Sequence, residues 1–265
     1  MDFQLTGKRA LVTGSSSGLG EATAKLLAAE GAEVVIHGRD EARAAAVAKT
    51  IREAGGAATL AIGGLDTDAG ADGVATAALS DGPVDILVNN VGVFDMSMDW
   101  TTTTPDHWAD IYNVNVISSV RLIQRLVPTM RERRWGRVIQ IGSVTGHLSS
   151  ARQPHYNATN AARDNLAQSL ARELRESGVT SNSVAPGGLL TDVNKEMLIG
   201  FGKANNMGET WEEIEPNVTR ALAPNDVGRI ARLDEVAAAV AYLASPVAGY
   251  ITGVTLHIDG GWYAQ

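Results

Sequence analysis

Short apolar runs alternate with longer helix-forming segments along the whole chain, and this alternation limits the fold more than any other feature. The apolar runs predict strands at residues 9–12, 33–36, 58–62, 85–88, 137–141, 180–184 and 255–258. The alanine- and leucine-rich segments between them predict helices at 21–30, 40–54, 71–79, 108–130, 156–176 and 234–244. Strands that are apolar on both faces and alternate with helices are typical of a parallel sheet covered on both sides. We therefore expect an α/β fold of the Rossmann type, with a doubly wound parallel sheet.

One segment, residues 188–230, does not follow this alternation. It is rich in Gly, Asn and Pro and is too long for an ordinary connection. We expect it to form a partly helical lid over a substrate. No linker or low-complexity tract divides residues 1–265, so we expect a single domain.

Composition excludes several classes of protein. The longest apolar runs are far shorter than the roughly 20 residues of a membrane span. A net charge of −8 argues against nucleic acid as a partner, and the absence of cysteine excludes disulfides and thiolate metal sites. Residues 1–8 lack the features of a signal peptide, so we expect a cytoplasmic protein with a small-molecule substrate, no metal, and no membrane or nucleic-acid partner.

The first predicted strand leads into a glycine-rich stretch, residues 13–20, with the spacing G-x-x-x-G-x-G. Such glycines allow a tight turn and a close approach of the backbone to a pyrophosphate at a helix N-terminus. The alternative is an ordinary glycine-rich turn, but its place after the first strand favours dinucleotide binding. The residues that we expect to contact the cofactor here are Gly14, Ser16, Ser17, Gly18, Leu19 and Gly20.

The second predicted strand is followed by Gly38 and Arg39 rather than by an acidic residue. An acidic residue would bind the ribose diol of NAD, whereas an arginine pairs with the 2′-phosphate of NADP. We therefore expect NADP(H) to be preferred over NAD(H). The alternative is that Arg39 is only a solvated residue at the start of a helix.

Acid–base chemistry is indicated between residues 143 and 160. Ser143 follows a buried strand, and Tyr156 begins a helical segment. Residue 160 lies one helical turn after Tyr156 and shares its face. A tyrosine that exchanges a proton with a carbinol oxygen is helped by a nearby cation, but this chain has Asn160 at that position.

These motifs together resemble the short-chain dehydrogenase/reductase family, in particular its single-domain group similar to 3-oxoacyl-carrier-protein reductases. The resemblance covers essentially the whole chain and rests on residues 13–20, 89–92, 115, 143, 156, 186–187 and 250–261. It implies an oxidoreductase that moves a hydride between a nicotinamide and a carbonyl or secondary alcohol. It also implies a homotetramer, in which the helix at 156–176 and the segment 250–265 pair subunits.

The resemblance also implies roles for individual residues. Tyr156 would be the acid/base, Ser143 would hold the substrate oxygen, and Asn115 would anchor a water of a proton relay, unless it only satisfies backbone in its helix. The remaining implied cofactor contacts are Leu65, through its backbone, and Asn90, Gly92, Tyr156, Asn160, Pro186, Gly187, Leu189 and Thr191. Near adenine, the register leaves either Gly64 or Asp66 at the position of the usual aspartate.

The main departure from the family is Asn160, which stands where the family has a lysine that binds the nicotinamide ribose. Asn160 can keep part of that hydrogen bonding but not the charge, so we expect impaired activity. Arg163 is a second cation near the same helical face, but it can equally serve a subunit interface.

The alternatives to a working reductase are a dinucleotide-binding protein with little turnover and a non-redox lyase on the same scaffold. The substrate stays open, although a mainly apolar pocket is suggested by Phe94, Met96, His147, Leu148, Met197, Phe201 and Trp211.

Overall fold

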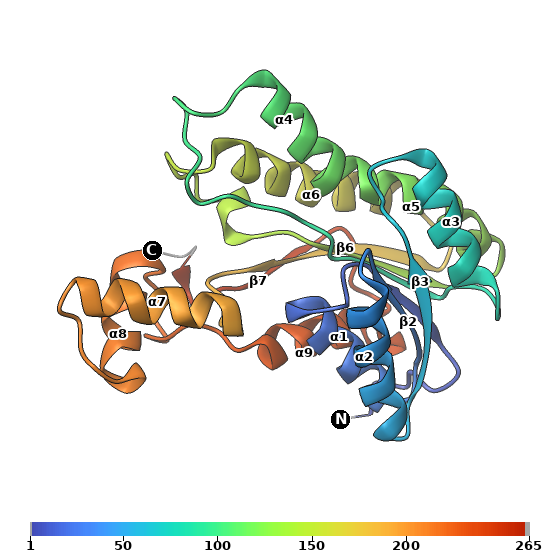
Figure 1. The fold of residues 1–265 in the computed structure, drawn as a ribbon. Coiled ribbons are helices and arrows are strands. Elements are labelled where there is room, and N and C mark those ends of the chain that lie inside the picture. Colours follow the sequence, from blue (N-terminus) through green and yellow to red (C-terminus); the bar gives the residue numbers. More distant parts are fainter. Residues whose placement is uncertain (1, 263–265) are drawn as a thin grey trace.

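A seven-stranded parallel sheet in the order β3-β2-β1-β4-β5-β6-β7 forms the centre of the molecule (Figure 1). The computed structural model describes residues 2–262, apart from the side chains of residues 192 and 193. The strands are β1 (Arg9–Val12), β2 (Glu33–Gly38), β3 (Ala57–Ile62), β4 (Ile86–Asn89), β5 (Gly136–Ile141), β6 (Val179–Pro186) and β7 (Thr255–Ile258). This architecture confirms the predicted Rossmann-type fold.

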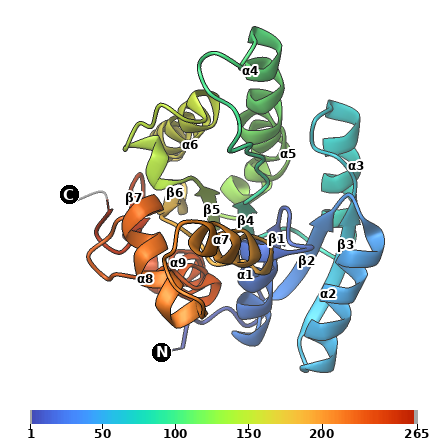
Figure 2. The same cartoon turned by 60° about the vertical axis from the view of Figure 1, so that its left-hand side comes forward.

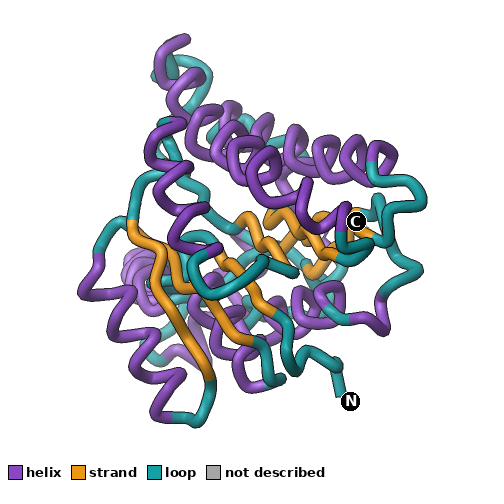
Figure 3. Tube along the Cα trace, turned by 90° about the vertical axis from the view of Figure 1, so that its right-hand side faces the viewer, coloured by secondary structure: helices purple, strands orange, loops and turns teal. Residues whose placement is uncertain are grey.

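Two layers of helices cover the sheet (Figures 2 and 3). One face is covered by α1 (Gly18–Ala29), α2 (Glu41–Glu53) and α9 (Leu233–Ala244), and the other by α3 (Asp68–Leu79), α5 (Ser118–Glu132) and α6 (Pro154–Glu173). Within β1, Ala10 and Val12 pack into the first core and Leu11 into the second. Both faces of the strand are therefore buried, which explains its uninterrupted apolar sequence.

The segment predicted as one helix at 108–130 consists of three elements. The helix α4 (Pro105–Tyr112) begins earlier than predicted, because the Thr104 side chain accepts a hydrogen bond from the His107 N–H at 3.3 Å. A π-helical turn (Asn113–Ile117) then joins α4 to α5. Turns of this kind are rare and concentrate at functional sites.

Residues 188–230 contain two helices, α7 (Asp192–Ala204) and α8 (Trp211–Leu222). They pack on each other through a small apolar cluster of their own, which includes Leu198, Ile214 and Val218. Figure 1 shows them beside β7 and α9, at one end of the sheet. Short 3₁₀ turns at Val144–Gly146 and Pro246–Ala248 complete the secondary structure of the described residues. Among residues 2–262, no helix has the length and apolar character that crossing a membrane requires.

Candidate active site

A cavity of about 600 Å³ lies at the carboxyl ends of the parallel strands. Its lining residues follow β1, β2, β3, β4, β5 and β6, and α6 contributes Tyr156 and Arg163. The neighbours β1 and β4 are not consecutive in the chain, so the strand order reverses between them. Open α/β sheets bind their ligands at this reversal, outside the carboxyl ends of the strands.

Most of the predicted site residues line this single cavity. They are Gly14, Ser16, Ser17, Gly18, Leu19, Arg39, Leu65, Asn90, Gly92, Ser143, Tyr156, Pro186, Gly187 and Leu189. Four predicted residues are not part of the lining, namely Gly20, Asn115, Asn160 and Thr191. Each of these four has a different position, described below.

The glycine loop, residues 13–20, has the geometry of a phosphate cradle. Gly14 and Gly18 have φ angles of 65° and 58°, in the region that favours glycine. A Cβ atom on Gly20 would lie 2.6 Å from Asn90 Nδ2, so this glycine lets α1 approach the β4 end of the site. Ser17 precedes the first turn of α1, and its hydroxyl makes no capping hydrogen bond there. The first amides of α1 therefore have no side-chain cap competing with an anionic ligand.

His37 connects the glycine loop to the neighbouring strands, a role that sequence reasoning missed. Its Nδ1 accepts a hydrogen bond from the Gly14 N–H at 2.9 Å. The proton must therefore be on Nε2, which lies 3.2 Å from the Gly63 carbonyl and donates to it. Burial lowers the pKa of His37 to about 4, although the bond to Gly63 opposes this and the charge of Arg39 adds to it. The ring is thus neutral at pH 7.

Two arginines line the end of the cavity next to β2. Arg39 follows Gly38, and Arg43 lies in the first turn of α2, where its N–H is capped by Asp40 Oδ1 at 3.1 Å. Sequence reasoning missed Arg43, although a second arginine four residues after Arg39 was an available signal. Gly38 is required by packing, because a Cβ atom there would lie 2.8 Å from Ser16 Oγ.

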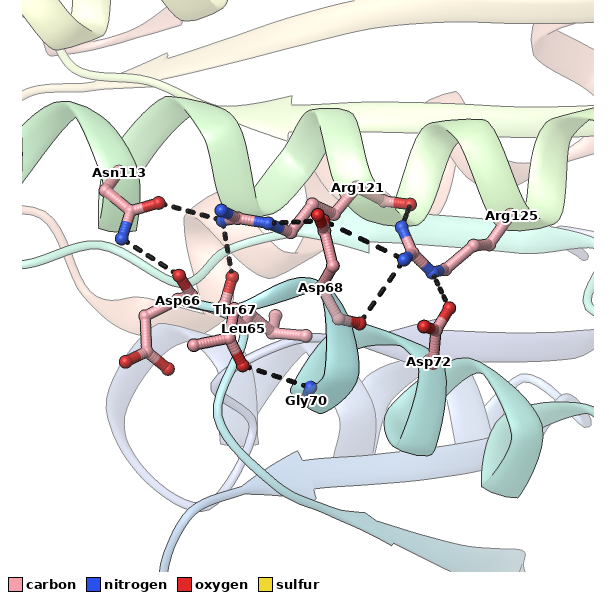
Figure 4. Close-up of polar contacts among 9 residues, drawn as sticks. All are labelled: Leu65, Asp66, Thr67, Asp68, Gly70, Asp72, Asn113, Arg121 and Arg125. Atoms are coloured by element: carbon pink, nitrogen blue, oxygen red, sulfur yellow. Dashed lines mark hydrogen bonds and ion pairs between the residues drawn. The ribbon is translucent and has the colours of Figure 1, made fainter.

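The loop after β3 forms another wall of the cavity through Leu65 and Asp66, whereas Gly64 is not part of the lining. Figure 4 shows how this loop is held. Arg121 Nη1 donates to the Leu65 carbonyl at 3.0 Å, and Asn113 Nδ2 donates to the Asp66 carbonyl at 2.9 Å. These contacts use the backbone carbonyls of the loop and leave the Asp66 carboxylate out of the bonds that hold it.

Ser143 and Tyr156 come from different elements and share the cavity. The Ser143 hydroxyl oxygen accepts hydrogen bonds from the Thr145 N–H at 3.3 Å and the Thr145 hydroxyl at 3.1 Å. Tyr156 lies in the first turn of α6, and its ring packs against Phe94 with ring centroids 5.8 Å apart. Two hydroxyl-bearing side chains therefore line the same cavity as the glycine loop, and hydroxyl groups are among those that can exchange a proton with a carbonyl oxygen.

Of the other apolar side chains that the sequence suggested for the substrate, several lie outside the lining. Met96, Met197 and Phe201 are exposed, and Trp211 packs in the α7/α8 cluster. Of the apolar side chains that the sequence suggested, Phe94 lines the cavity and packs on the Tyr156 ring.

Asn160 is turned towards its own helix. Its Nδ2 donates to the Tyr156 main-chain carbonyl at 2.9 Å, and the residue is 2% exposed. The Asn160 side chain thus supports the backbone of α6.

Arg163 lies inside the subunit and lines the cavity. It is 4% exposed, which rules out the surface position that the sequence left open for it. Its Nε donates to the Asn115 carbonyl at 2.5 Å, Nη1 donates to the Ile141 carbonyl, and Nη2 donates to the Val91 carbonyl. Burial lowers the pKa of Arg163 to about 10, against the opposing charges of Tyr156 and Asp164. The guanidinium therefore stays positive at neutral pH.

Asn115 and Thr191 act on the backbone around the cavity. Asn115 Oδ1 accepts from the Val93 N–H at 2.8 Å, and its Nδ2 donates to the Val93 carbonyl at 2.9 Å. Asn115 therefore holds the segment after β4, while its own carbonyl binds Arg163. Thr191 begins α7, because its hydroxyl oxygen accepts from the Asn194 N–H at 3.2 Å.

Comparisons with known proteins agree with this geometry. The family described as short chain dehydrogenase matches residues 8–199. Over 263 residues the chain is 36% identical to a 3-oxoacyl-[acyl-carrier-protein] reductase of Vibrio harveyi, and the alignment covers 98% of this chain and 99% of that protein.

Solved structures are also similar to this chain over nearly its whole length. The L-sorbose reductase of Gluconobacter frateurii, complexed with NADPH and L-sorbose, has a TM-score of 0.92 and 31% identity, with 100% of both chains covered. A 3-oxoacyl (acyl-carrier-protein) reductase from Agrobacterium tumefaciens C58 with NADP bound has a TM-score of 0.88 and 35% identity, covering 98% of this chain and 95% of that one.

Proposed function

Because the chain belongs to the short-chain dehydrogenase family, we propose that it interconverts a carbonyl and a secondary alcohol on a small molecule, with NADP(H) as its preferred cofactor. The family assigns it to the dinucleotide-dependent oxidoreductases. The observation that carries the proposal is that the Ser143 and Tyr156 hydroxyls share one cavity with the glycine loop.

The cavity fits a dinucleotide on structural grounds. The positive φ angles of Gly14 and Gly18 shape the loop, and the first turn of α1 has no side-chain cap. A pyrophosphate is the kind of group that such a helix end binds. We assign the adenine to the wall formed by Leu65 and Asp66, whereas Pro186, Gly187 and Leu189 line the opposite part of the cavity.

Preference for NADP(H) is supported by charge. Arg39 and Arg43 both line the cavity beside β2, and the residue that follows the strand is not acidic. A 2′-phosphate offers these arginines charge-assisted hydrogen bonds that a ribose diol does not.

When bound, the nicotinamide supplies or accepts the hydride. The chain supplies the proton and the orientation. Ser143 Oγ donates a hydrogen bond to the substrate oxygen, and Tyr156 Oη gives its proton to that oxygen during reduction or removes it during oxidation. Phe94 packs on the Tyr156 ring and limits its movement.

Turnover of NADPH with a panel of ketones tests the proposal directly. The panel contains a simple alkyl ketone, a β-keto thioester and a ketose, and the ultraviolet absorbance of NADPH is followed beside a fluorescence titration of NADPH binding. We expect the Tyr156→Phe variant to keep its affinity for NADPH and to lose roughly 10²–10⁴-fold in kcat, since the hydroxyl that moves the proton is gone.

Two results would contradict the proposal. Full activity of Tyr156→Phe would exclude this mechanism. Tight NADPH binding without consumption of any ketone would instead favour a binding protein with little turnover.

A further inference from the structure

Arg163 is a buried cation on the same wall of the cavity as Tyr156. The two residues are separated by seven positions on α6, or about two helical turns, and therefore share a face of the helix. Both line the space that also contains Ser143. A charged side chain is almost never fully buried without a specific reason.

Three carbonyl oxygens fix the Arg163 guanidinium in place. They belong to Asn115 in the π-helical turn, Ile141 at the end of β5 and Val91 after β4. An arginine has five N–H donors, so three of them orient the group and two are left for other partners. The guanidinium is therefore preorganised at the cavity wall.

The charge of Arg163 has no direct counter-ion. Among the described residues, no carboxylate lies within ion-pair distance of it, and its three bonds all go to neutral backbone groups. Asp164 is the adjacent residue in the chain, but its carboxylate binds Ser183 Oγ at 2.5 Å and lies 3.0 Å from His147 Nε2. A buried cation with no carboxylate bonded to it favours a negative charge that forms nearby.

Asn160 is not in a position to provide a comparable interaction. Its amide is bonded to the Tyr156 main-chain carbonyl and is not part of the cavity lining.

We propose that Arg163 provides the positive charge that stabilises the Tyr156 oxygen when Tyr156 gives up its proton, and that Asn160 has no part in this. This inference rests on the proposed function. In carbonyl reduction the Tyr156 O–H bond breaks and its proton goes to the substrate oxygen, while the carbonyl carbon gains the hydride of the reduced nicotinamide. The phenolate that is left faces the guanidinium until a water returns the proton. Arg163 acts through Tyr156 by stabilising the charge on the Tyr156 oxygen, so it is a positioning residue and not a catalytic one.

Other ionisable groups surround α6, so the test must compare variants rather than interpret one pH profile. They are Asp164 and His155 on α6 itself, His147 and His257 at one side, and His107 on α4. All of them stay unchanged when only residue 163 is replaced.

The central pair of variants is Arg163→Gln and Arg163→Lys. Glutamine keeps N–H donors and removes the charge, whereas lysine keeps the charge. We expect Arg163→Gln to lose about tenfold or more in kcat and to move the pH of half-maximal alcohol oxidation upward by about one unit. Arg163→Lys should keep most of the rate and a profile close to wild type.

A relocated charge gives an independent test. Adding Asn160→Lys to Arg163→Gln places a cation one turn from Tyr156, and we expect it to restore both kcat and the pH profile. Arg175→Leu removes one positive charge from the exposed end beyond α6 and serves as the matched control. Thermal unfolding and NADPH affinity are measured for every variant, so that loss of structure or of cofactor binding is detected separately from loss of turnover.

The outcomes separate the two proposals. If wild-type protein does not consume NADPH with any ketone of the panel, the proposed function fails. If wild type is active and a folded, NADPH-binding Arg163→Gln has the wild-type rate and pH profile, the role of Arg163 is wrong. If Arg163→Gln, Arg163→Lys and the double variant all fail to fold, Arg163 is a structural residue and the inference is overturned.

Discussion

The proposed preference for NADP(H) rests on side chains next to the end of β2. Arg39 lies between β2 and α2, and Arg43 lies in the first turn of α2; both line the cavity, and Gly38 leaves space for Ser16. If both arginines bind the 2′-phosphate of NADPH, the affinity of the protein for NADPH should fall each time one of them is removed.

We expect Arg39→Ala and Arg43→Ala each to weaken NADPH binding about tenfold, with little effect on NADH, because a charge-assisted hydrogen bond contributes about that much. The double variant should bind both cofactors equally. Fluorescence titration at two salt concentrations measures this, with Arg52→Ala, in the last turn of α2, as the control. Equal affinities of wild-type protein for NADPH and NADH would show that these arginines do not select the cofactor.

Because His37 is buried in its neutral form, we expect the free energy of unfolding to fall in acid. Its pKa is about 4 in the folded protein and about 6.5 in the unfolded chain, because burial disfavours the charged ring. Between these values the unfolded chain binds a proton that the folded protein does not bind. The free energy of unfolding therefore falls as the pH decreases from 6.5 to 4, by about 3 kcal/mol in total, and this part of the stability is complete above pH 6.5.

The variant His37→Asn isolates this contribution. The asparagine oxygen can accept from the Gly14 N–H but has no proton to gain in this range. Urea unfolding at several pH values should give a flatter pH dependence for the variant than for wild type. Parallel curves would mean that other groups, such as His155 and His257, whose pKa values burial also lowers, account for the slope.

Between elements, a set of ion pairs joins the start of α3 to α5 and supports one wall of the cavity (Figure 4). Arg121 Nε pairs with Asp68 at 3.0 Å, and Arg125 Nε pairs with Asp72 at 2.6 Å. The acidic partners are exposed, so the pairs themselves contribute little to stability. What differs between the two arginines is that Arg121 also binds the Leu65 carbonyl.

We therefore expect Arg121→Ala to weaken cofactor binding severalfold, because the Leu65–Asp66 wall loses its support, while Arg125→Ala leaves the affinity close to wild type. Isothermal titration with NADPH compares the two variants under one condition. Equal losses in both would indicate that the whole α3–α5 contact, rather than the bond to Leu65, positions this wall.

At the scale of the whole molecule, exposed apolar side chains near the C-terminal end of the described chain bear on how subunits pair. We propose a homotetramer paired through α6 and the segment 250–265, of which residues 263–265 lie outside the described part of the structure. Tyr250 is fully exposed in the single chain, and Val247 and Val254 beside it are exposed as well. A cluster of exposed apolar side chains often marks a surface that a partner covers.

Light scattering at micromolar concentration should show a tetramer for wild-type protein. Tyr250→Glu should shift it towards dimer or monomer, because a charge would be buried at the interface. Ala46→Glu, an equally drastic change on the exposed side of α2, should leave assembly unchanged. A wild-type monomer would exclude this mode of assembly.

The amino-acid sequence by itself predicted the α/β fold and singled out the glycine loop, Ser143 and Tyr156, which contribute to the lining of one cavity. These features depend on local composition and periodicity, which a chain carries before it folds. Uniformly apolar strands indicated a sheet buried on both faces, and the position of residues 13–20 after β1 indicated the cofactor site.

Only the tertiary structure decided that Arg163, and not Asn160, lines the cavity together with Tyr156. The bonds of Arg163 reach Ile141, Asn115 and Val91, which are 22, 48 and 72 residues away in the chain. Helical spacing placed Asn160 and Arg163 near one face, but it could not show that Asn160 would bond to its own helix while Arg163 entered the cavity. The same holds for His37, whose neutral state follows from burial between Gly14 and Gly63. Such contacts arise when distant segments pack together, because burial and long-range hydrogen bonding have no signature in local sequence.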